Sequence, residues 1–438
     1  MVDIAQIVDD DPDSARFAVH RSAFTSPEVL DRERELIFEA SWLYVGHESE
    51  IKERNDFLTR RVAGRPVILT RDREGVPRVL LNTCRHRGAE VCRVRRGNAR
   101  VFTCSYHGWA YDGTGHLVSV PDGDAYSPAF DRDKLGLYEP RADSYRGFVF
   151  INLNGRADSL ADYLDDARYL LDLLADQSAA GMRIVSGQHN YSMKANWKLL
   201  MENGIDGQHG MTVHQTYFEM MGNLGSPVQL MADSRVLNTG IDLGGGHSMT
   251  LCPELGSPFL TEDVHHELQR QRVGHVERFG EAYTHQMLDT TRNVNVFPNL
   301  VLIDIQFGIQ IRTMWPTAPG HTEITGWQLA PSDATDEVHD YRMTNAMTFW
   351  GPAGLATPDD IEALEQCQRG FAAEREVGFS DLSRGIGRPD SPGGGELPQR
   401  AFWRAWNERI NGVPCAREGA RWDRNYLAGV NGESSRDD

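Results

Sequence analysis

Two pairs of residues, each with one cysteine and one histidine, carry the clearest chemistry in this sequence. Cys84 and His86 form the first pair, Cys104 and His107 form the second, and seventeen residues separate the two pairs. Two thiolates and two neutral imidazoles are the ligands of a Rieske [2Fe–2S] centre, in which the cysteines hold one iron and the histidines hold the other. The spacing therefore predicts such a cluster, with a reduction potential above that of an all-cysteine ferredoxin.

The same four residues have two other interpretations. Two cysteines and two histidines can bind zinc, but zinc fingers usually pair Cys with Cys and His with His along the chain. A disulfide between Cys84 and Cys104 would leave both histidines without a role. The mixed pairs therefore favour the iron–sulfur cluster.

A second group of candidate ligands follows in the segment 196–217. Asp206 and His209 are three residues apart, and His214 follows five residues later. Positions i and i+3 share a helix face, but positions i and i+5 do not, so the helix should loosen around Gly210 if both imidazoles are to converge. Two neutral imidazoles and one carboxylate make the facial triad of non-haem Fe(II) oxygenases, so one further carboxylate is expected elsewhere.

The segment 350–365 offers that carboxylate. Thr357 as N-cap and Pro358 at the first helical position predict a helix, with Leu364 on its apolar face. Asp359 and Asp360 fall in the first turn of this helix. They could stabilise the helix dipole by about 0.3–1 kcal/mol each, or one of them could bind a metal, and the pattern alone leaves both interpretations open.

Composition favours a large cytoplasmic enzyme. The chain has 438 residues, which suits two or three domains, and a formal net charge of −18, which argues against a nucleic-acid partner. No secretory signal is visible at the acidic N-terminus, and no apolar stretch approaches the ~18 residues that span a membrane. The six cysteines, of which two are predicted cluster ligands, make a disulfide framework unexpected.

One segment of this acidic chain is strongly basic. Residues 51–100 contain fourteen Lys and Arg residues against five Asp and Glu residues. This charge could belong to a solvated loop face, or it could steer an acidic electron donor to the cluster. Under the second interpretation Arg95 and Arg96 are the docking residues. The arginines on or between the two pairs are Arg85, Arg87, Arg93, Arg95, Arg96 and Arg100.

Hydrophobic patterning divides the chain into three parts, at 1–45, 46–155 and 156–438. In the first part, Ser26 and Pro27 start a predicted helix that should pack on the third part. The second part has short β-branched and aromatic runs between Gly, Pro and Asp residues, which predict a β-sandwich. A helix near 161–175 and a longer α+β region follow. The apolar positions of the first helix are Leu30, Ile37, Phe38 and Trp42, and the predicted strands are 57–59, 67–70, 79–81, 101–103 and 148–151.

Taken together, these motifs resemble the large (α) subunit of Rieske non-haem iron aromatic-ring-hydroxylating dioxygenases. That family includes the naphthalene, biphenyl, benzoate and p-cumate dioxygenases, and the segment 196–217 is most similar to the p-cumate type. The resemblance covers nearly the whole chain. Besides the two cysteine–histidine pairs, it includes WLYVGH at 42–47, the block from Asn196 to His214, FPN at 297–299, GPAG at 351–354, and Asp359-Asp360 with Glu365.

The resemblance implies a role for each candidate ligand. In this family the second aspartate of the pair, five residues before a glutamate, ligates the iron, which assigns Asp360 as the third ligand beside His209 and His214. Asp206 is implied to link His209 to His107 of the cluster on the neighbouring subunit.

The resemblance also implies a substrate pocket beside the iron. Trp350 and Ala356 flank the third ligand, and the small Ala356 should leave room for a ring substituent. Many relatives carry Tyr where this chain has Gln208, a change that would tune the iron or the pocket without removing a ligand. The other expected pocket residues are Asn203, Val213 and Asn293.

The family fold implied here is α+β. It has a Rieske β-sandwich domain near the start and a catalytic domain whose antiparallel sheet is surrounded by helices. The implied enzyme is a homotrimer of α chains, with or without a small β subunit. It would receive electrons from NADH through a reductase, directly or by way of a ferredoxin. Its implied reaction adds both atoms of O2 to an aromatic compound, such as a substituted benzoate, to give a cis-dihydrodiol.

Two alternative functions remain at this point. A Rieske monooxygenase or demethylase of the same superfamily would share every ligand. An electron-transfer Rieske protein would explain only the two cysteine–histidine pairs, and would leave the segments 196–217 and 350–365 without a function.

Overall fold

The chain forms two compact units in a computed structural model. The smaller unit contains residues 38–163, and the larger contains 1–37 together with 164–438. The boundaries expected from the sequence, at 45/46 and 155/156, lie several residues inside the smaller unit. The structure describes residues 3–185, 187–226, 239–252, 257–305, 308–388, 395–414 and 417–418.

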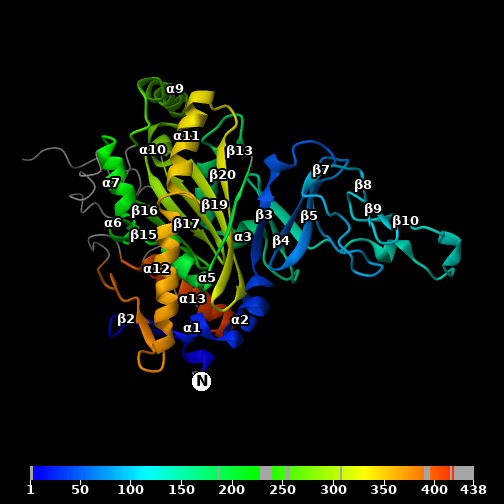
Figure 1. Cartoon of the computed structure of the whole chain (residues 1–438), viewed down its shortest axis with the longest axis horizontal. Helices are drawn as coiled ribbons and strands as arrows, with labels where there is room; N and C mark the ends of the chain where they lie inside the picture. Colours follow the sequence, from blue (N-terminus) through cyan, green and yellow to red (C-terminus); the bar gives the residue numbers. More distant parts are fainter. Residues whose placement is uncertain are drawn as a thin grey trace, which may run out of the picture. The chain divides into compact units, whose positions relative to one another are not determined.

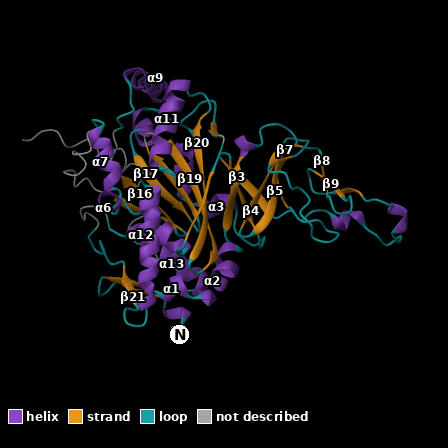
Figure 2. Cartoon of the chain, in the orientation of Figure 1, coloured by secondary structure: helices purple, strands orange, loops and turns teal. Residues whose placement is uncertain are grey.

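The smaller unit consists mainly of strands and loops (Figure 2). It holds three antiparallel sheets, in the orders β6-β5-β4-β7, β10-β9-β8 and β11-β12-β3. All five strands predicted from β-branched and aromatic runs are present, inside β4, β5, β6, β8 and β12. The strands are β3 Trp42–His47, β4 Asp56–Val62, β5 Arg65–Arg71, β6 Pro77–Leu81, β7 Arg96–Asn98, β8 Val101–Thr103, β9 Ala110–Asp112, β10 Leu117–Ser119, β11 Arg141–Tyr145 and β12 Phe148–Asn152.

The first predicted helix begins as expected but ends early. In α2 (Pro27–Glu33) the Ser26 hydroxyl accepts a hydrogen bond from the Val29 amide, and a π-helical turn then ends at Phe38. The prediction that Trp42 belongs to this helix is wrong. Trp42 begins β3, because β3 forms backbone hydrogen bonds with β12, and this long-range pairing outweighs a local apolar spacing that suits either element.

The larger unit is built around an eight-stranded antiparallel sheet with helices packed against it (Figure 1). The strand order is β13-β20-β19-β18-β17-β16-β15, and β14 also pairs with β20. A separate small sheet has the order β1-β2-β21. The strands are β1 Val8–Asp11, β2 Arg16–His20, β13 Met182–Ile184, β14 His189–Met193, β15 Thr239–Gly244, β16 His247–Cys252, β17 Thr291–Val296, β18 Leu300–Ile305, β19 Gly308–Ala318, β20 His321–Pro331 and β21 Phe379–Asp381.

Helices flank the second group of candidate ligands, with α5 before it and α6 and α7 within and after it. The predicted helix at 161–175 is broken at Asp165, which has a positive φ of 42° and separates α3 from α4. No helix in the described ranges is long and apolar enough to cross a membrane. The α-helices are α1 Ser22–Thr25, α2 Pro27–Glu33, α3 Leu160–Leu164, α4 Ala167–Ala175, α5 Trp197–Gly204, α6 Gly210–Val213, α7 Gln215–Asn223, α9 Glu262–Phe279, α10 Glu281–Leu288, α11 Asp336–Phe349, α12 Thr357–Gly370 and α13 Leu397–Asn411.

A buried polar cluster fixes α5 in place. Glu33 at the end of α2 accepts hydrogen bonds from Lys198 Nζ at 2.6 Å and from the indole nitrogens of Trp197 and Trp406, each at 2.8 Å. Glu33 and Lys198 have no solvent-exposed side-chain surface. Because every bond to this carboxylate is charge-assisted, α5 has a defined position when it reaches the candidate site. The Asn196 side chain caps the same helix by accepting a hydrogen bond from the Lys198 amide.

Candidate metal centres

The two cysteine–histidine loops of the smaller unit share one backbone conformation. In each, the cysteine amide donates to the carbonyl five residues later, and the glycine four residues after the cysteine donates back to the cysteine carbonyl, at 2.8–2.9 Å. Gly88 and Gly108, the glycines concerned, have φ values of 79° and 72°, which strain any residue with a Cβ. The same backbone pattern therefore presents Cys84 and Cys104 from two loops.

The side chains of these loops fit the ligand set of a Rieske cluster. Cys84 and Cys104 are buried free thiols, so the disulfide interpretation is wrong. The imidazoles of His86 and His107 lie with their ring centroids 4.5 Å apart. His86 Nδ1 is buried and has no hydrogen-bond partner among the residues that the structure describes, as expected of an atom that binds a metal.

Neighbouring aromatic and charged side chains contact the four residues. The His86 ring stacks on Trp109 at 5.1 Å, and the Tyr111 hydroxyl lies 3.3 Å from Cys84 Sγ while it accepts from the Arg85 amide. Burial, together with the nearby His86 and Arg87, lowers the pKa of His107. A lowered pKa keeps the imidazole neutral, which is the protonation state that ligates a metal.

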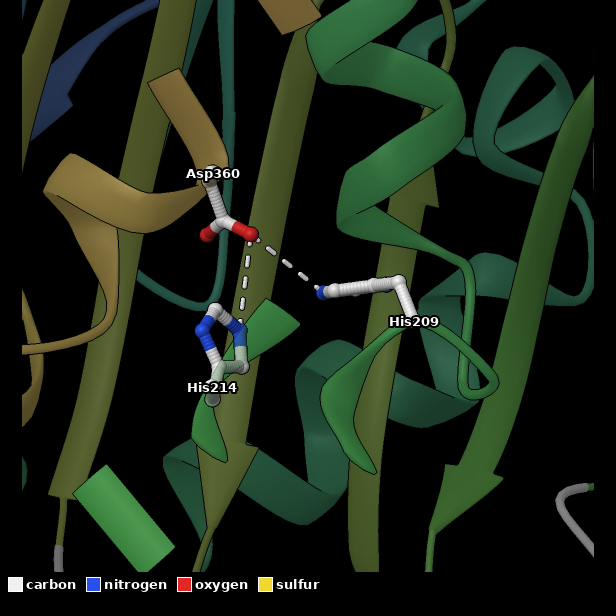
Figure 3. Close-up of side chains that lie close together, drawn as sticks. All are labelled: His209, His214 and Asp360. Atoms are coloured by element: carbon white, nitrogen blue, oxygen red, sulfur yellow. Dashed lines mark ion pairs between the residues drawn. The ribbon is translucent and has the colours of Figure 1, made fainter. Parts of the chain in front are cut away.

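In the larger unit, His209, His214 and Asp360 converge on one point (Figure 3). The Nε2 atoms of both imidazoles lie 3.4 Å from Asp360 Oδ1. The potential ligand atoms of the three residues all lie within 4.8 Å of one another. Two imidazoles and one carboxylate that converge in this way fit an open-sided facial triad.

A break in the helix brings the two histidines together. We expected the helix to loosen around Gly210; α5 ends earlier, at Gly204, and Gly210 instead begins the short helix α6. His209 precedes α6 and His214 follows it. Each imidazole is thus attached at an irregular backbone position, which removes the constraint that positions five apart cannot share a helix face.

The structure distinguishes the two aspartates at the start of α12. Asp360 faces the histidines and is only 7% exposed, whereas Asp359 makes no ion pair with them. The prediction that Thr357 is the N-cap is wrong: Ala356 precedes the helix, and the Thr357 hydroxyl accepts instead from the Gly351 amide at 3.0 Å. Thr357 therefore fixes the turn that leads into α12, next to the carboxylate.

Two residues of the same block contact two of the three converging side chains. Asn203 Nδ2 donates to Asp360 Oδ1 at 3.1 Å, so this expected pocket residue contacts a candidate ligand. Asp206 Oδ2 lies 3.3 Å from His209 Nδ1, and Asp206 Oδ1 accepts from the Gln208 amide at 2.7 Å. Nothing in the spacing of Asn203 and Asp360 along the chain pointed to the first of these contacts.

The electrostatics of the two histidines differ. For His209, burial acts to lower the pKa, but the carboxylates of Asp206 and Asp360 outweigh it and raise the pKa above its ordinary value. For His214, burial dominates and lowers the pKa. The carboxylates that raise the pKa of His209 would also attract a divalent cation, and a bound cation would displace the proton.

The remaining predicted site residues differ in how deeply they are buried. Trp350 and Ala356 are each 1% exposed, while Val213 and Asn293 are half-buried. The Gln208 side chain accepts a hydrogen bond from Arg384, so its amide is already engaged.

In the smaller unit, Arg95 and Arg96 are exposed, and neither forms an ion pair with a described residue. Val94 beside them is 62% exposed. The positive charge of these arginines is therefore available to a partner.

Comparisons with known proteins agree with both centres. A family model described as "Rieske [2Fe-2S] domain" matches residues 41–131, and one described as "Ring hydroxylating alpha subunit (catalytic domain)" matches residues 183–412. The α subunit of toluate 1,2-dioxygenase from Pseudomonas putida is 35% identical over 87% of this chain and 84% of its own length. The large subunit of anthranilate 1,2-dioxygenase from Acinetobacter baylyi is 36% identical over 86% and 82%. A crystal structure of naphthalene 1,2-dioxygenase from Rhodococcus sp. superposes with a TM-score of 0.76 at 32% identity, over 90% of this chain and 94% of that one.

Proposed function

Because this chain belongs to the family of Rieske ring-hydroxylating dioxygenase α subunits, we propose that it adds both atoms of O2 to the ring of an aromatic acid, such as a substituted benzoate. The product would be a cis-dihydrodiol. The protein is a Rieske non-haem iron oxygenase with a [2Fe–2S] cluster and a mononuclear iron. The aromatic-acid substrate is supported by the relatives, since toluate and anthranilate are both ring carboxylates.

One observation carries the choice of an oxygenase over an electron-transfer protein. His209, His214 and Asp360 converge in the same chain that carries the cysteine–histidine loops. An electron-transfer Rieske protein needs no second, open-sided site.

We assign the ligands as follows. The cluster would be held by Cys84, His86, Cys104 and His107, and the iron by His209, His214 and Asp360. When bound, the cluster supplies electrons and the iron supplies the reaction with dioxygen.

The protein's own residues position these groups. Asn203 would fix the rotamer of Asp360 through its hydrogen bond, and Asp206 would orient His209. The Asp206 side chain is 31% exposed, so a second imidazole, His107 of a neighbouring copy, could approach its other face. This arrangement would make the enzyme depend on a homotrimer, with or without a β subunit.

The proposed substrate pocket and the proposed donor-docking residues belong to different units of the chain. Trp350, Ala356, Val213 and Asn293 are the proposed pocket residues. Arg95 and Arg96 would dock an acidic donor, either an NADH-dependent reductase or a ferredoxin that the reductase serves. The proposed location is the cytoplasm.

Metal content and isotope incorporation test this function. About three irons and two sulfides per chain are expected, against two irons for an electron-transfer protein and zinc for a structural site. Turnover of a substituted benzoate under ¹⁸O2 should place two labelled atoms in the product. One labelled atom, or loss of a methyl group, would instead assign a monooxygenase or demethylase.

A further inference from the structure

The large sheet has one face toward the metal-binding residues, and the register shows which side chains lie on it. The end of α5 packs on this face: Gly204 lies against the Val301 side chain, and the Thr250 hydroxyl donates to the Ile205 carbonyl. Thr250 pairs with Asn293 of the next strand, and Asn293 pairs with Ile303. Ile303 lies two residues after Val301 on β18. Since alternate residues of a strand share a face, all of these side chains lie on the α5 side.

Arg312 of β19 lies on the same face. Its Cα partners are Val301 on β18 and Gly326 on β20, and directly paired residues point to one side of a sheet. Arg312 is only 3% exposed. Gly326 has no side chain, and the Gln310 amide lies over it, 3.5 Å from the position that a Cβ would take.

The charge of Arg312 is not neutralised by any described residue. Its Nε and Nη2 atoms both donate to Gln310 Oε1, at 3.1 and 2.8 Å, and this acceptor is a neutral amide. No described carboxylate lies within ion-pair distance, and Nη1 has no hydrogen-bond partner in the described ranges. By contrast, the buried Arg292 pairs with Asp304 and the buried Arg400 pairs with Glu418. A buried cation without a counter-ion costs several kcal/mol, so its retention calls for a ligand.

Arg312 lies on the same face of the sheet as a residue that neighbours the metal-binding group. Burial raises the pKa of the Tyr191 hydroxyl, while the Arg312 charge acts to lower it and the Asp360 carboxylate acts to raise it. Tyr191 of β14 lies on the same face as Arg312, because His189, two residues before it, pairs with Gly326. Arg312 and Asp360 are therefore neighbours of one side chain, yet are not paired with each other.

We infer that Arg312 binds the carboxylate of the aromatic acid and thereby directs the ring toward the candidate iron site. This inference rests on the proposed function, which supplies the aromatic acid but no residue that recognises its charge. A guanidinium held by a neutral amide keeps its full charge, and its free Nη1 can donate to a carboxylate oxygen. Arg312 is thus a residue that determines specificity for acids over neutral aromatic compounds.

A second buried arginine provides a matched control. Arg342 of α11 is 7% exposed, and within the described part of the chain its Nε also has no hydrogen-bond partner. Burial lowers the pKa of the Arg342 guanidinium, and the Asp304 carboxylate acts to raise it. Asp304 lies on the opposite face of the sheet from its neighbour Ile303. Loss of Arg342 removes a second buried cation, one whose electrostatic partner Asp304 points to the other face of the sheet from Arg312.

The test compares binding of benzoate with binding of benzamide, its neutral analogue, to the anaerobic holoenzyme by calorimetry. Arg312→Gln should weaken benzoate binding by about 30-fold or more and change benzamide binding by less than about threefold. Arg312→Lys should lose less, because it keeps the charge. Arg342→Gln should leave the ratio of the two affinities unchanged.

Gln310→Glu keeps the test decisive even if Arg312→Gln does not fold. This nearly isosteric change puts a carboxylate at the atom that already accepts from Arg312, so it should neutralise the guanidinium and reduce benzoate binding selectively. If the wild type binds benzoate and both Arg312→Gln and Gln310→Glu keep the wild-type affinity ratio, the inference is wrong while the proposed function stands. If the wild type binds neutral aromatics but no aromatic acid, the proposed substrate class and the inference both fail.

Discussion

Asn203 donates a hydrogen bond to the same Asp360 oxygen that both candidate histidines face. The Nδ2–Oδ1 distance is 3.1 Å, and each histidine Nε2 lies 3.4 Å from that oxygen. Asn203 lies in the last turn of α5, whose first turn is anchored by the buried Glu33–Lys198 pair. The orientation of one candidate ligand therefore depends on a helix whose position is fixed at its other end.

Replacing Asn203 tests this dependence. Asn203→Ala should lower the affinity for mononuclear iron by about 10- to 100-fold, because the carboxylate loses the bond that holds its rotamer. The cluster should be retained. Iron and acid-labile sulfide measured after dialysis against a chelator separate the two centres, and iron retention equal to the wild type would show that Asp360 needs no such support.

Asp206→Asn tests the proposed bridge between subunits. The amide is isosteric, so the variant should fold, assemble and bind both metals, but it should lose the negative charge that orients His209. We expect donor reduction of the cluster to proceed normally and its single-turnover reoxidation, with substrate and oxygen present, to slow strongly. A reoxidation rate equal to the wild type would remove Asp206 from the electron path.

A purely structural Asp206 predicts a different pattern. Its Oδ1 accepts from the Gln208 amide, so loss of a turn-stabilising bond could cost about 0.5–2 kcal/mol. In that case, Asp206→Ala would lose activity only in proportion to the unfolded fraction, and thermal melting would detect it.

Reversal of the basic patch tests donor docking. The double variant Arg95→Glu/Arg96→Glu should slow cluster reduction by the physiological donor, while chemically reduced enzyme keeps its turnover. The wild-type reduction rate should fall as salt rises. Arg73→Glu, at an 84% exposed side chain of the same unit, is the control. Equal effects of both reversals would indicate a solvated loop face with no specific partner.

His107→Cys tests the assignment of the cluster. Thiolate can replace imidazole, so the variant should retain an iron–sulfur centre, but with a potential shifted toward ferredoxin values because the added negative charge favours the oxidised cluster. Redox titration followed by electron paramagnetic resonance measures the shift. A potential that does not change would mean that His107 is not a ligand.

Glu202 predicts a pH-dependent stability. Burial raises the pKa of Glu202 to about 7, although Trp403 Nε1 donates to it at 2.6 Å. The folded state therefore binds this proton more tightly than the unfolded state, and stability is lost as pH rises from about 4.5 through 7, by up to ~3 kcal/mol. Glu202→Gln should melt higher than the wild type at pH 8 and at a similar temperature at pH 5. A melting difference that does not vary with pH would contradict the raised pKa.

Features that depend on residue type and short spacing could be predicted from the sequence. The proposed ligands of each cluster loop lie within four positions of one another, and a Rieske centre needs these side chains in this order, so the sequence was enough to propose Cys84 and His86 as ligands. The strands of the smaller unit could also be predicted, because β-branched and aromatic residues between turn residues favour a strand whatever lies elsewhere in the chain. Trp42 was misassigned because its apolar spacing suits a helix as well as a strand, and only β12, about a hundred residues later, selects the strand.

Features that depend on side-chain direction and on contacts between distant residues became visible only in the folded chain. Asp359 and Asp360 are adjacent and chemically alike, and only the packing of α12 beside α5 and α6 turns Asp360 toward the histidines. Asn203 meets Asp360 across 157 positions of the chain, and no periodicity encodes that contact. Arg312 reads from the sequence as an ordinary strand residue. Its unpaired charge exists because the register of three strands places it, with a neutral amide and a glycine, on the face that α5 covers.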